Sequence, residues 1–292
     1  METNTAKIIA KYNNTNRKII LGPRTFNFKN KKVALCLGSG GMRGSYQAGV
    51  IKALEEKGIK ADIVVGTSIG SLNGAAYVQG YTADKLIDLW TNIKQEDIYT
   101  CEWTTNEKLN QVLEKMMNKA GSGDLLLIGA SLLSGSVDNS AYCNFVPNVI
   151  DKDKILNSNI QYGLGTIKVS GGLKYTELTK EQMGNDLCDY IICSSSAYPV
   201  FPAHELNGEK YIDGGYSDGL AIDFCRKLGA EHIIAVDIGT SATHKDEMKS
   251  KDVTYLLGNN LGSFLNFEQE QIQANLKLGY NDAMKAFEHY KA

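Results

Sequence analysis

Residues 31–80 constrain the fold most, because two apolar runs alternate with two helix-forming segments. KKVALCL is aliphatic and β-branched and leads into the glycine-rich stretch GSGGMRG, a pattern typical of a buried strand that enters a tight loop. SYQAGVIKALEEKG then carries apolar residues at helical spacing and ends in glycine. ADIVVG predicts a second buried strand, with a small-residue helix after it. This order predicts parallel strands covered by helices.

The rest of the chain predicts one α/β domain with additions. Residues 31–240 are interpreted as the main domain, interrupted at about 82–160 by a helical insertion, because that stretch reads as successive helices. Residues 1–30 are interpreted as an N-terminal extension, and residues 241–292 as a helical segment packed on the same domain. The predicted fold class is a three-layer α/β/α arrangement around a mainly parallel sheet.

Two later segments predict further strands. YGLGTIKVSGGLKYTEL (162–178) alternates around a Gly-Gly pair, which indicates a hairpin or two adjacent strands. EHIIAVDI (231–238) is a continuous apolar run and predicts another buried strand. The strands predicted in both segments can belong to the same sheet.

Composition narrows the class of protein. With 43% hydrophobic and 22% charged residues the chain is an ordinary globular protein, and a net charge of −2 gives no reason to expect nucleic-acid binding. No secretory-type signal opens the sequence, and no stretch approaches the ~20 apolar residues of a membrane span. Six cysteines occur without CxxC pairs, which favours buried thiols in a reducing compartment over disulfides or a metal site. We therefore expect a cytoplasmic protein.

The segment Gly66-Thr67-Ser68-Ile69-Gly70 matches the Gly-x-Ser-x-Gly pattern between a predicted strand and a predicted helix. Glycines two residues on either side of Ser68 remove Cβ atoms that would clash in a sharp turn. The following helix N-terminus would offer unpaired N–H groups to developing negative charge. The pattern by itself is weak, but its position favours a nucleophilic Ser68 over an ordinary serine in a small-residue loop.

A nucleophilic serine needs a proton acceptor, and the four histidines are poor candidates. His232 opens a buried strand, where a structural role is favoured, and His244 and His289 lie in polar segments expected to face solvent. His204, close in sequence to Asp213, is the best remaining candidate for a serine–histidine–aspartate triad.

The segment YIDGGYSDGLAI (211–222) offers a carboxylate instead. Asp213 ends a short apolar stretch, and Gly214 and Gly215 would let its backbone come close to the serine turn. A partly desolvated carboxylate within hydrogen-bond reach can act as a general base. The alternative is a plain Asp-Gly-Gly turn.

The glycine-rich loop GSGGMRG (38–44) presents backbone N–H groups to an anion. A dinucleotide-binding loop would need an acidic residue at the end of the next strand, which here continues into Thr67 and Ser68. We therefore predict an oxyanion hole formed by the N–H groups of Gly40, Gly41 and Met42. Arg43 either holds this loop in shape, meets a substrate phosphate, or lies on the surface.

These three motifs, in this order, resemble the patatin-like phospholipase family, in its bacterial form. GSGGMRG, GTSIG and DGG match the family's oxyanion loop, serine elbow and aspartate motif, and CSSSAYPVFPAHELNGEKYIDGGYSDGLAI (193–222) is similar to the segment around its aspartate. The resemblance covers about residues 31–240. Two departures stand out: Gly38 and Ser39 fill the first places of the oxyanion loop, and Asp218 replaces a frequent asparagine.

The resemblance implies a serine acyl hydrolase that cleaves lipid esters through a Ser68–Asp213 dyad and an acyl-enzyme, with no catalytic histidine, metal or cofactor. Its supporting residues would be Arg43, Gly44, Gly66, Ile69, Gly70, Gly214 and Gly215. The implied partner is a phospholipid, lysophospholipid or acylglycerol, with peripheral membrane contact where that lipid lies in a bilayer. The oligomeric state is left open.

Two other functions remain open at this point. A lipid transacylase would use a lipid alcohol in place of water, and a lipid-binding regulatory module would keep the fold without turnover. The run DLLLIGASLLSG (124–135) and the helix around LWTNI (89–93) are expected either to line an apolar channel for an acyl chain or to pack in the core.

Overall fold

A computed structural model of the 292-residue chain describes residues 5–7, 28, 30–101, 137–239, 244 and 246–290. Three sequence expectations lie mostly or wholly outside these residues. They are the N-terminal extension 1–30, the middle part of the helical insertion (residues 102–136) and, within that part, the apolar run 124–135.

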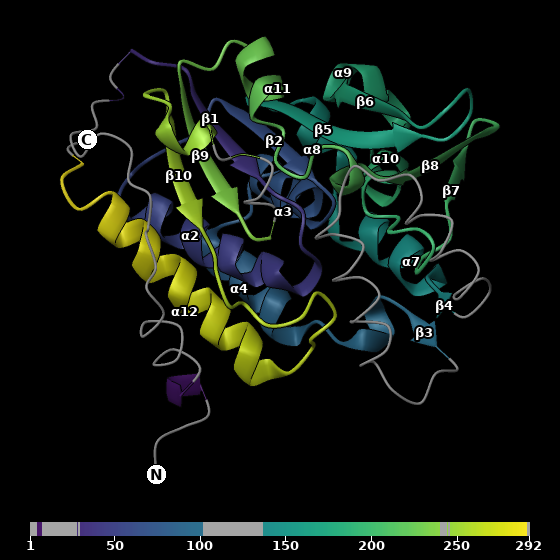
Figure 1. Ribbon diagram of the computed structural model, residues 1–292, viewed down its shortest axis with the longest axis horizontal. Coiled ribbons are helices and arrows are strands. Elements are labelled where there is room, and N and C mark those ends of the chain that lie inside the picture. Colours follow the sequence, from purple (N-terminus) through teal and green to yellow (C-terminus); the bar gives the residue numbers. More distant parts are fainter. Residues whose placement is uncertain are drawn as a thin grey trace.

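Eight strands of the described residues form one sheet in the order β10-β9-β1-β2-β5-β8-β7, with β6 paired to β5 (Figure 1). The pairs from β10 to β5 along this order are parallel, and the pairs of β5 with β6 and β8 and of β7 with β8 are antiparallel. The mainly parallel sheet and the β5–β6 hairpin are therefore confirmed. The strands are β1 (Val33–Leu37), β2 (Ile63–Thr67), β5 (Gln161–Lys168), β6 (Lys174–Thr179), β7 (His204–Leu206), β8 (Glu209–Asp213), β9 (His232–Asp237) and β10 (Val253–Leu257).

The helices follow the expected order on both faces of this sheet. A short ribbon of β3 (Thr100–Cys101) and β4 (Val137–Asp138) lies outside it. The helices are α2 (Gly44–Glu56), α3 (Ile69–Val78), α4 (Ala83–Asn92), α7 (Ser140–Val149), α8 (Lys152–Leu156), α9 (Lys180–Met183), α10 (Leu187–Ser194), α11 (Ile222–Lys227) and α12 (Gln269–Ala286). None of those in the described ranges is both long and apolar enough to cross a membrane.

Alternate residues of the strands feed two apolar cores, because successive side chains of a strand point to opposite faces. Leu35 and Leu37 of β1 join a large cluster with α2, α3, α4 and α12. Ala34 and Cys36 join a smaller cluster with α11 on the other face. The three layers are thus unequal: a thick group of helices covers one face, and α11 with its flanking segments covers the other (Figure 1).

The segment after residue 241 differs from its helical expectation. Val253–Leu257 forms strand β10, which extends the sheet beside β9. This run of five residues is short and lies next to charged and polar segments, so its sequence did not predict a strand. The expected helix is present as α12, which packs along α2 and is tied to it by a buried hydrogen bond from Tyr46 Oη to Asp282 Oδ2 of 2.8 Å.

Strand β5 aligns the ends of β2 and β8. β6 pairs along Gly163–Lys168 of β5, which overlaps the stretches that pair with β2 and with β8. Since a strand has two edges, β2 and β8 share the edge opposite β6. Thr67 lies opposite Gly165, and Asp213 lies opposite the next residue, Thr166. The backbone ladder therefore brings the residue after Thr67 beside Asp213.

Candidate active site

Ser68 occupies a sharp turn between β2 and α3. Its backbone has φ 55° and ψ −127°, a strained conformation for a residue with a side chain. The turn needs glycine on both sides, because a Cβ on Gly66 would lie 2.3 Å from the Gly70 carbonyl oxygen, and a Cβ on Gly70 would lie 2.1 Å from that of Leu37. This is the geometry that the Gly-x-Ser-x-Gly pattern predicts.

Asp213 receives a hydrogen bond from this serine. Ser68 Oγ donates to Asp213 Oδ2 at 2.6 Å, and the Gly215 N–H donates to Oδ1 at 2.7 Å. The carboxyl is only 2% exposed, and its burial raises its pKa to about 7, although both hydrogen bonds favour the charged form. Asp213 can therefore exchange a proton near neutral pH.

Three of the four histidines are engaged elsewhere, and His289 is exposed near the end of the chain. The His232 ring lies 2.8 Å from Thr254 Oγ1, and burial lowers its pKa to about 4. His204 lies 3.2 Å from an Asp189 carboxylate oxygen. His244, expected in solvent, has a side chain only 13% exposed and lies 3.3 Å from Asp218. Among the residues that the structure describes, no histidine lines the pocket beside Ser68.

Two residues of the serine run 194–196 anchor the two members of the pair. Ser194 Oγ accepts from the Ser68 N–H at 2.8 Å and donates to the Gly165 carbonyl at 2.7 Å. The Ser196 carbonyl accepts from the Asp213 N–H at 2.8 Å. No role was predicted for this serine run. The signal was a row of small hydroxyl residues shortly before the aspartate motif.

The glycine-rich loop lies on the other side of Ser68, as the 3₁₀ turn Gly41–Arg43 that leads into α2 at Gly44. Gly41 has φ +56°, and a Cβ there would lie 2.3 Å from the Phe264 carbonyl oxygen, so this position requires glycine. Within the described part of the chain, the N–H groups of Gly40 and Gly41 have no hydrogen-bond acceptor.

Met42 differs from its expected role. Its N–H donates to the Phe264 carbonyl at 2.8 Å, so it is not free to bind an oxyanion. Sequence reasoning could not find this bond, because Phe264 lies more than 200 residues along the chain. Gly40 and Gly41 remain as the loop's candidate donors, and Ile69 begins α3, where its N–H has no acceptor within the helix.

The connection between β10 and α12, residues 258–268, also holds the loop through Arg43. Arg43 Nε donates to the Gly262 carbonyl at 2.8 Å, and its guanidinium lies 3.9 Å from the centre of the Phe264 ring. Of the three roles left open for Arg43, these contacts favour holding the loop in shape.

Buried polar side chains of α2 and α3 donate hydrogen bonds to both ends of the loop. Gln47 Nε2 donates to the Gly38 carbonyl at 2.7 Å, and Asn73 Nδ2 donates to the Gly44 carbonyl at 3.0 Å. Trp90 Nε1 in turn donates to Asn73 Oδ1 at 3.0 Å. Trp90 of the LWTNI helix therefore packs in the core.

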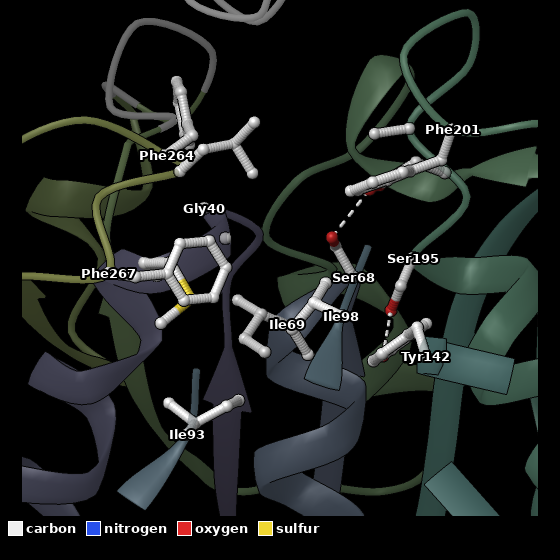
Figure 2. A pocket seen from close by; sticks show the side chains of 15 residues that line it. Gly40, Ser68, Ile69, Ile93, Ile98, Tyr142, Ser195, Phe201, Phe264 and Phe267 are labelled. Carbon is white, nitrogen blue, oxygen red and sulfur yellow. Dashed lines mark hydrogen bonds between the residues drawn. The ribbon is translucent and has the colours of Figure 1, made fainter. Parts of the chain in front are cut away.

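An apolar pocket opens beside the serine, enclosing about 690 Å³ counted out to its open mouth. Figure 2 shows Ser68 between Gly40, Phe264 and Phe267 on one side and Ser195, Tyr142 and Phe201 on the other. Ile93, which ends the LWTNI stretch, lines it. The lining is Gly40, Gly41, Met42, Ser68, Ile69, Ile93, Ile98, Tyr142, Ser195, Ala197, Phe201, Asp213, Phe264, Leu265 and Phe267. The described residues contain no group of three or more His, Cys, Asp or Glu that could hold a metal.

A family model described as patatin-like phospholipase matches residues 35–225. This range contains the glycine-rich loop, the serine elbow and Asp213, and it ends before β9, β10 and α12. The predicted resemblance is thereby confirmed on the segment that carries the three motifs.

Similar curated proteins include "Lysophospholipase nte1" of Aspergillus niger, 30% identical over 221 residues, and "Patatin-like phospholipase domain-containing protein 6" of Homo sapiens, 30% identical over 210 residues. The matches cover 72% and 71% of this chain but only 12% and 13% of those proteins. This chain therefore corresponds to a small part of each relative.

Among solved structures, VipD from Legionella pneumophila matches 96% of this chain and 72% of its own, with a TM-score of 0.52 and 14% identity. At that identity the likeness concerns the fold alone.

Proposed function

The chain belongs to the patatin-like phospholipase family, and from this premise we propose that it is a serine acyl hydrolase that cleaves lipid carboxylic esters. The observation that carries the proposal is the 2.6 Å hydrogen bond from Ser68 Oγ to a buried Asp213 carboxylate. A serine hydroxyl is a weak nucleophile until a neighbouring base takes its proton. Asp213, whose pKa is about 7, is the group placed to do so.

The proposed reaction has two halves. Asp213 takes the proton of Ser68 as Oγ attacks the ester carbonyl, and the N–H groups of Gly40 and Gly41, with Ile69 at the start of α3, bind the resulting oxyanion. Asp213 then returns the proton to the departing alcohol, which leaves an acyl group on Ser68. Water attacks this ester with Asp213 again as base, and the fatty acid is released.

The lining of the pocket supports an acyl chain as the group that enters it. Its side chains are aliphatic or aromatic apart from a few hydroxyls and Asp213, and apolar clefts of this kind bind apolar ligands with a few polar groups fixing orientation. Relatives carry the name lysophospholipase, so a phospholipid, lysophospholipid or acylglycerol ester is the proposed substrate. Contact with a lipid surface would be peripheral.

Ser68→Ala and Asp213→Asn should each abolish ester hydrolysis while circular dichroism and melting show a folded protein. Ser217→Ala is the matched control, because Ser217 is exposed close to Asp213 in the chain. A panel of phospholipid, lysophospholipid and acylglycerol esters, assayed with and without chelator, identifies the substrate. A fluorophosphonate probe should label the unmodified protein and leave Ser68→Ala unlabelled. Full activity in folded Asp213→Asn would eliminate the dyad.

A further inference from the structure

Two hydroxyls in the pocket have no part in the proposed reaction. Besides Ser68 and Asp213, the lining side chains with an oxygen or nitrogen atom are those of Tyr142 from α7 and Ser195, which follows α10. Figure 2 shows the two side by side, on the opposite side of Ser68 from Gly40 and Phe267. In an apolar pocket, such isolated polar groups determine which ligand group is accepted beside them.

The direction of their hydrogen bonds can be assigned from chemistry. Ser195 Oγ lies 3.0 Å from the Ile191 carbonyl, which can only accept, so the single Ser195 hydrogen points to that carbonyl. Tyr142 Oη lies 3.0 Å from Ser195 Oγ and must donate to it. Burial raises the pKa of Tyr142, so the phenol keeps this hydrogen at neutral pH. Both hydrogens are therefore used within the protein, and only acceptor lone pairs remain.

The serine run holds this acceptor pair in the same pocket as Ser68 and Asp213. Ser194 binds the backbone of Ser68, and Ser196 binds the backbone of Asp213. Ser195 lies between these two anchors, and its neighbour Tyr142 is 7% exposed. The pair is thus fixed relative to both members of the proposed dyad.

We propose that Tyr142 and Ser195 form a binding site for a hydroxyl group, accepting a hydrogen bond from an O–H donor beside the ester carbon. The inference rests on the proposed function. The donor can come from two sources: the free alcohol of a monoacyl glycerophospholipid, or the water that attacks the acyl-enzyme. A diacyl lipid has an ester in place of that alcohol and offers no donor. The two sources affect different measurements.

The binding arm uses Ser68→Ala, which cannot turn over. Its dissociation constants are measured for a lysophospholipid and for an analogue with hydrogen in place of the free hydroxyl. If the lipid alcohol is the donor, the analogue binds about two- to tenfold more weakly, the range of one net hydrogen bond. The difference should become smaller in Ser68→Ala/Tyr142→Phe, because this variant loses one of the two acceptors. The control is Ser68→Ala/Tyr190→Phe, because Tyr190 lies outside the pocket.

The kinetic arm uses Tyr142→Phe with Ser68 intact, on the same two lipids. If water is the donor, both are hydrolysed more slowly because deacylation is slowed, and a burst of released alcohol precedes the steady state. Ser195→Ala should behave alike, since Tyr142 then has its hydrogen free to point into the pocket. Unchanged binding differences and unchanged deacylation in a folded Tyr142→Phe protein would overturn the site.

The two proposals fail differently. If the proposed function is wrong, the unmodified protein will neither cleave esters nor react with fluorophosphonate, whatever the behaviour of Tyr142→Phe. Loss of the hydroxyl site would appear as ester cleavage that Tyr142→Phe leaves unchanged on both lipids.

Discussion

The two sides of the pocket are held in place by different kinds of structure. Ser68 follows the end of β2 and Asp213 ends β8, and β5 aligns these two strand ends through backbone hydrogen bonds. Ser194 and Ser196 reinforce this arrangement. The glycine-rich loop also has backbone bonds, such as that from the Met42 N–H to the Phe264 carbonyl, but it depends in addition on side chains. These are Gln47 and Asn73 on one side and Arg43, bound to the β10–α12 connection, on the other, and together they form a side-chain clamp. Many backbone hydrogen bonds together fix the register of a strand, whereas each side chain of the clamp can be removed by a single substitution.

This difference leads to a division of effects. Damage to the strand-aligned side should remove activity together with local packing. Each substitution in the clamp should lower kcat by a limited factor, while the fold and the proton transfer to Asp213 stay unchanged. The β10–α12 connection, which binds Arg43 and Met42, lies beyond the residues that the family model matches. The geometry of the loop therefore depends in part on a segment outside that match.

The largest effect is expected for Gly70→Ala, which tests the strand-aligned side. The new Cβ would lie 2.1 Å from the Leu37 carbonyl oxygen, so the backbone must shift at the serine turn. Since a misplacement of about 1 Å can cost 10²-fold in rate, we expect at least that loss, with a lower melting temperature. Gly74→Ala, four residues along α3, is the control, because its closest contact is a Val64 methyl at 3.0 Å. Equal losses in both variants would remove the special role of the turn.

The pH dependence of hydrolysis should come from the strand-aligned side alone. Asp213 must be unprotonated to act as base and has a pKa of about 7, so kcat/KM should rise with pH and level off above that value. Two pH units below it, the rate should be about 100-fold lower. Variants of the clamp should keep the same midpoint. A midpoint near 4, the ordinary value for an aspartate, would contradict the raised pKa of Asp213.

Arg43→Gln should produce a smaller loss, on the clamp side. It removes the guanidinium over Phe264 and weakens the hold on the N–H groups of Gly40 and Gly41. We expect kcat to fall about 10- to 100-fold, within the cost of one misplaced oxyanion donor, with KM and the pH midpoint little changed. Arg43→Lys should recover part of this loss. Arg226→Gln, which breaks ion pairs outside the pocket, should lower the melting temperature without lowering kcat.

The smallest effect concerns stability. The folded-state pKa of Asp213, about 7, lies above the ordinary aspartate value of 3.8. The folded state therefore binds this proton more tightly, and the stability that the group contributes below about pH 4 is lost as pH rises through 7. Asp213→Asn lacks this loss. The melting temperature of Asp213→Asn minus that of the unmodified protein should therefore increase from pH 5 to pH 8. The corresponding change in the free energy of unfolding is a few kcal/mol at most. A constant difference across this range would contradict the raised pKa.

The sequence alone determined the features that depend on near neighbours. The strand, glycine loop, helix and serine turn of residues 31–80 follow from apolar spacing and from glycines within a few positions of one another, and each is present as expected. Asp213 was also identified, because its Asp-Gly-Gly turn is a local pattern that accompanies the other two motifs in a known family.

Only the tertiary structure decided which groups meet across long stretches of chain. It paired Ser68 with Asp213, 145 positions apart, and it gave Ser194 and Ser196 their anchoring roles. It also used the Met42 N–H for a bond to Phe264 and added β10 to the sheet. The physical reason is that a hydrogen bond or a packing contact depends on distance in space. Neither the composition nor the periodicity of a segment records which distant segment will lie against it.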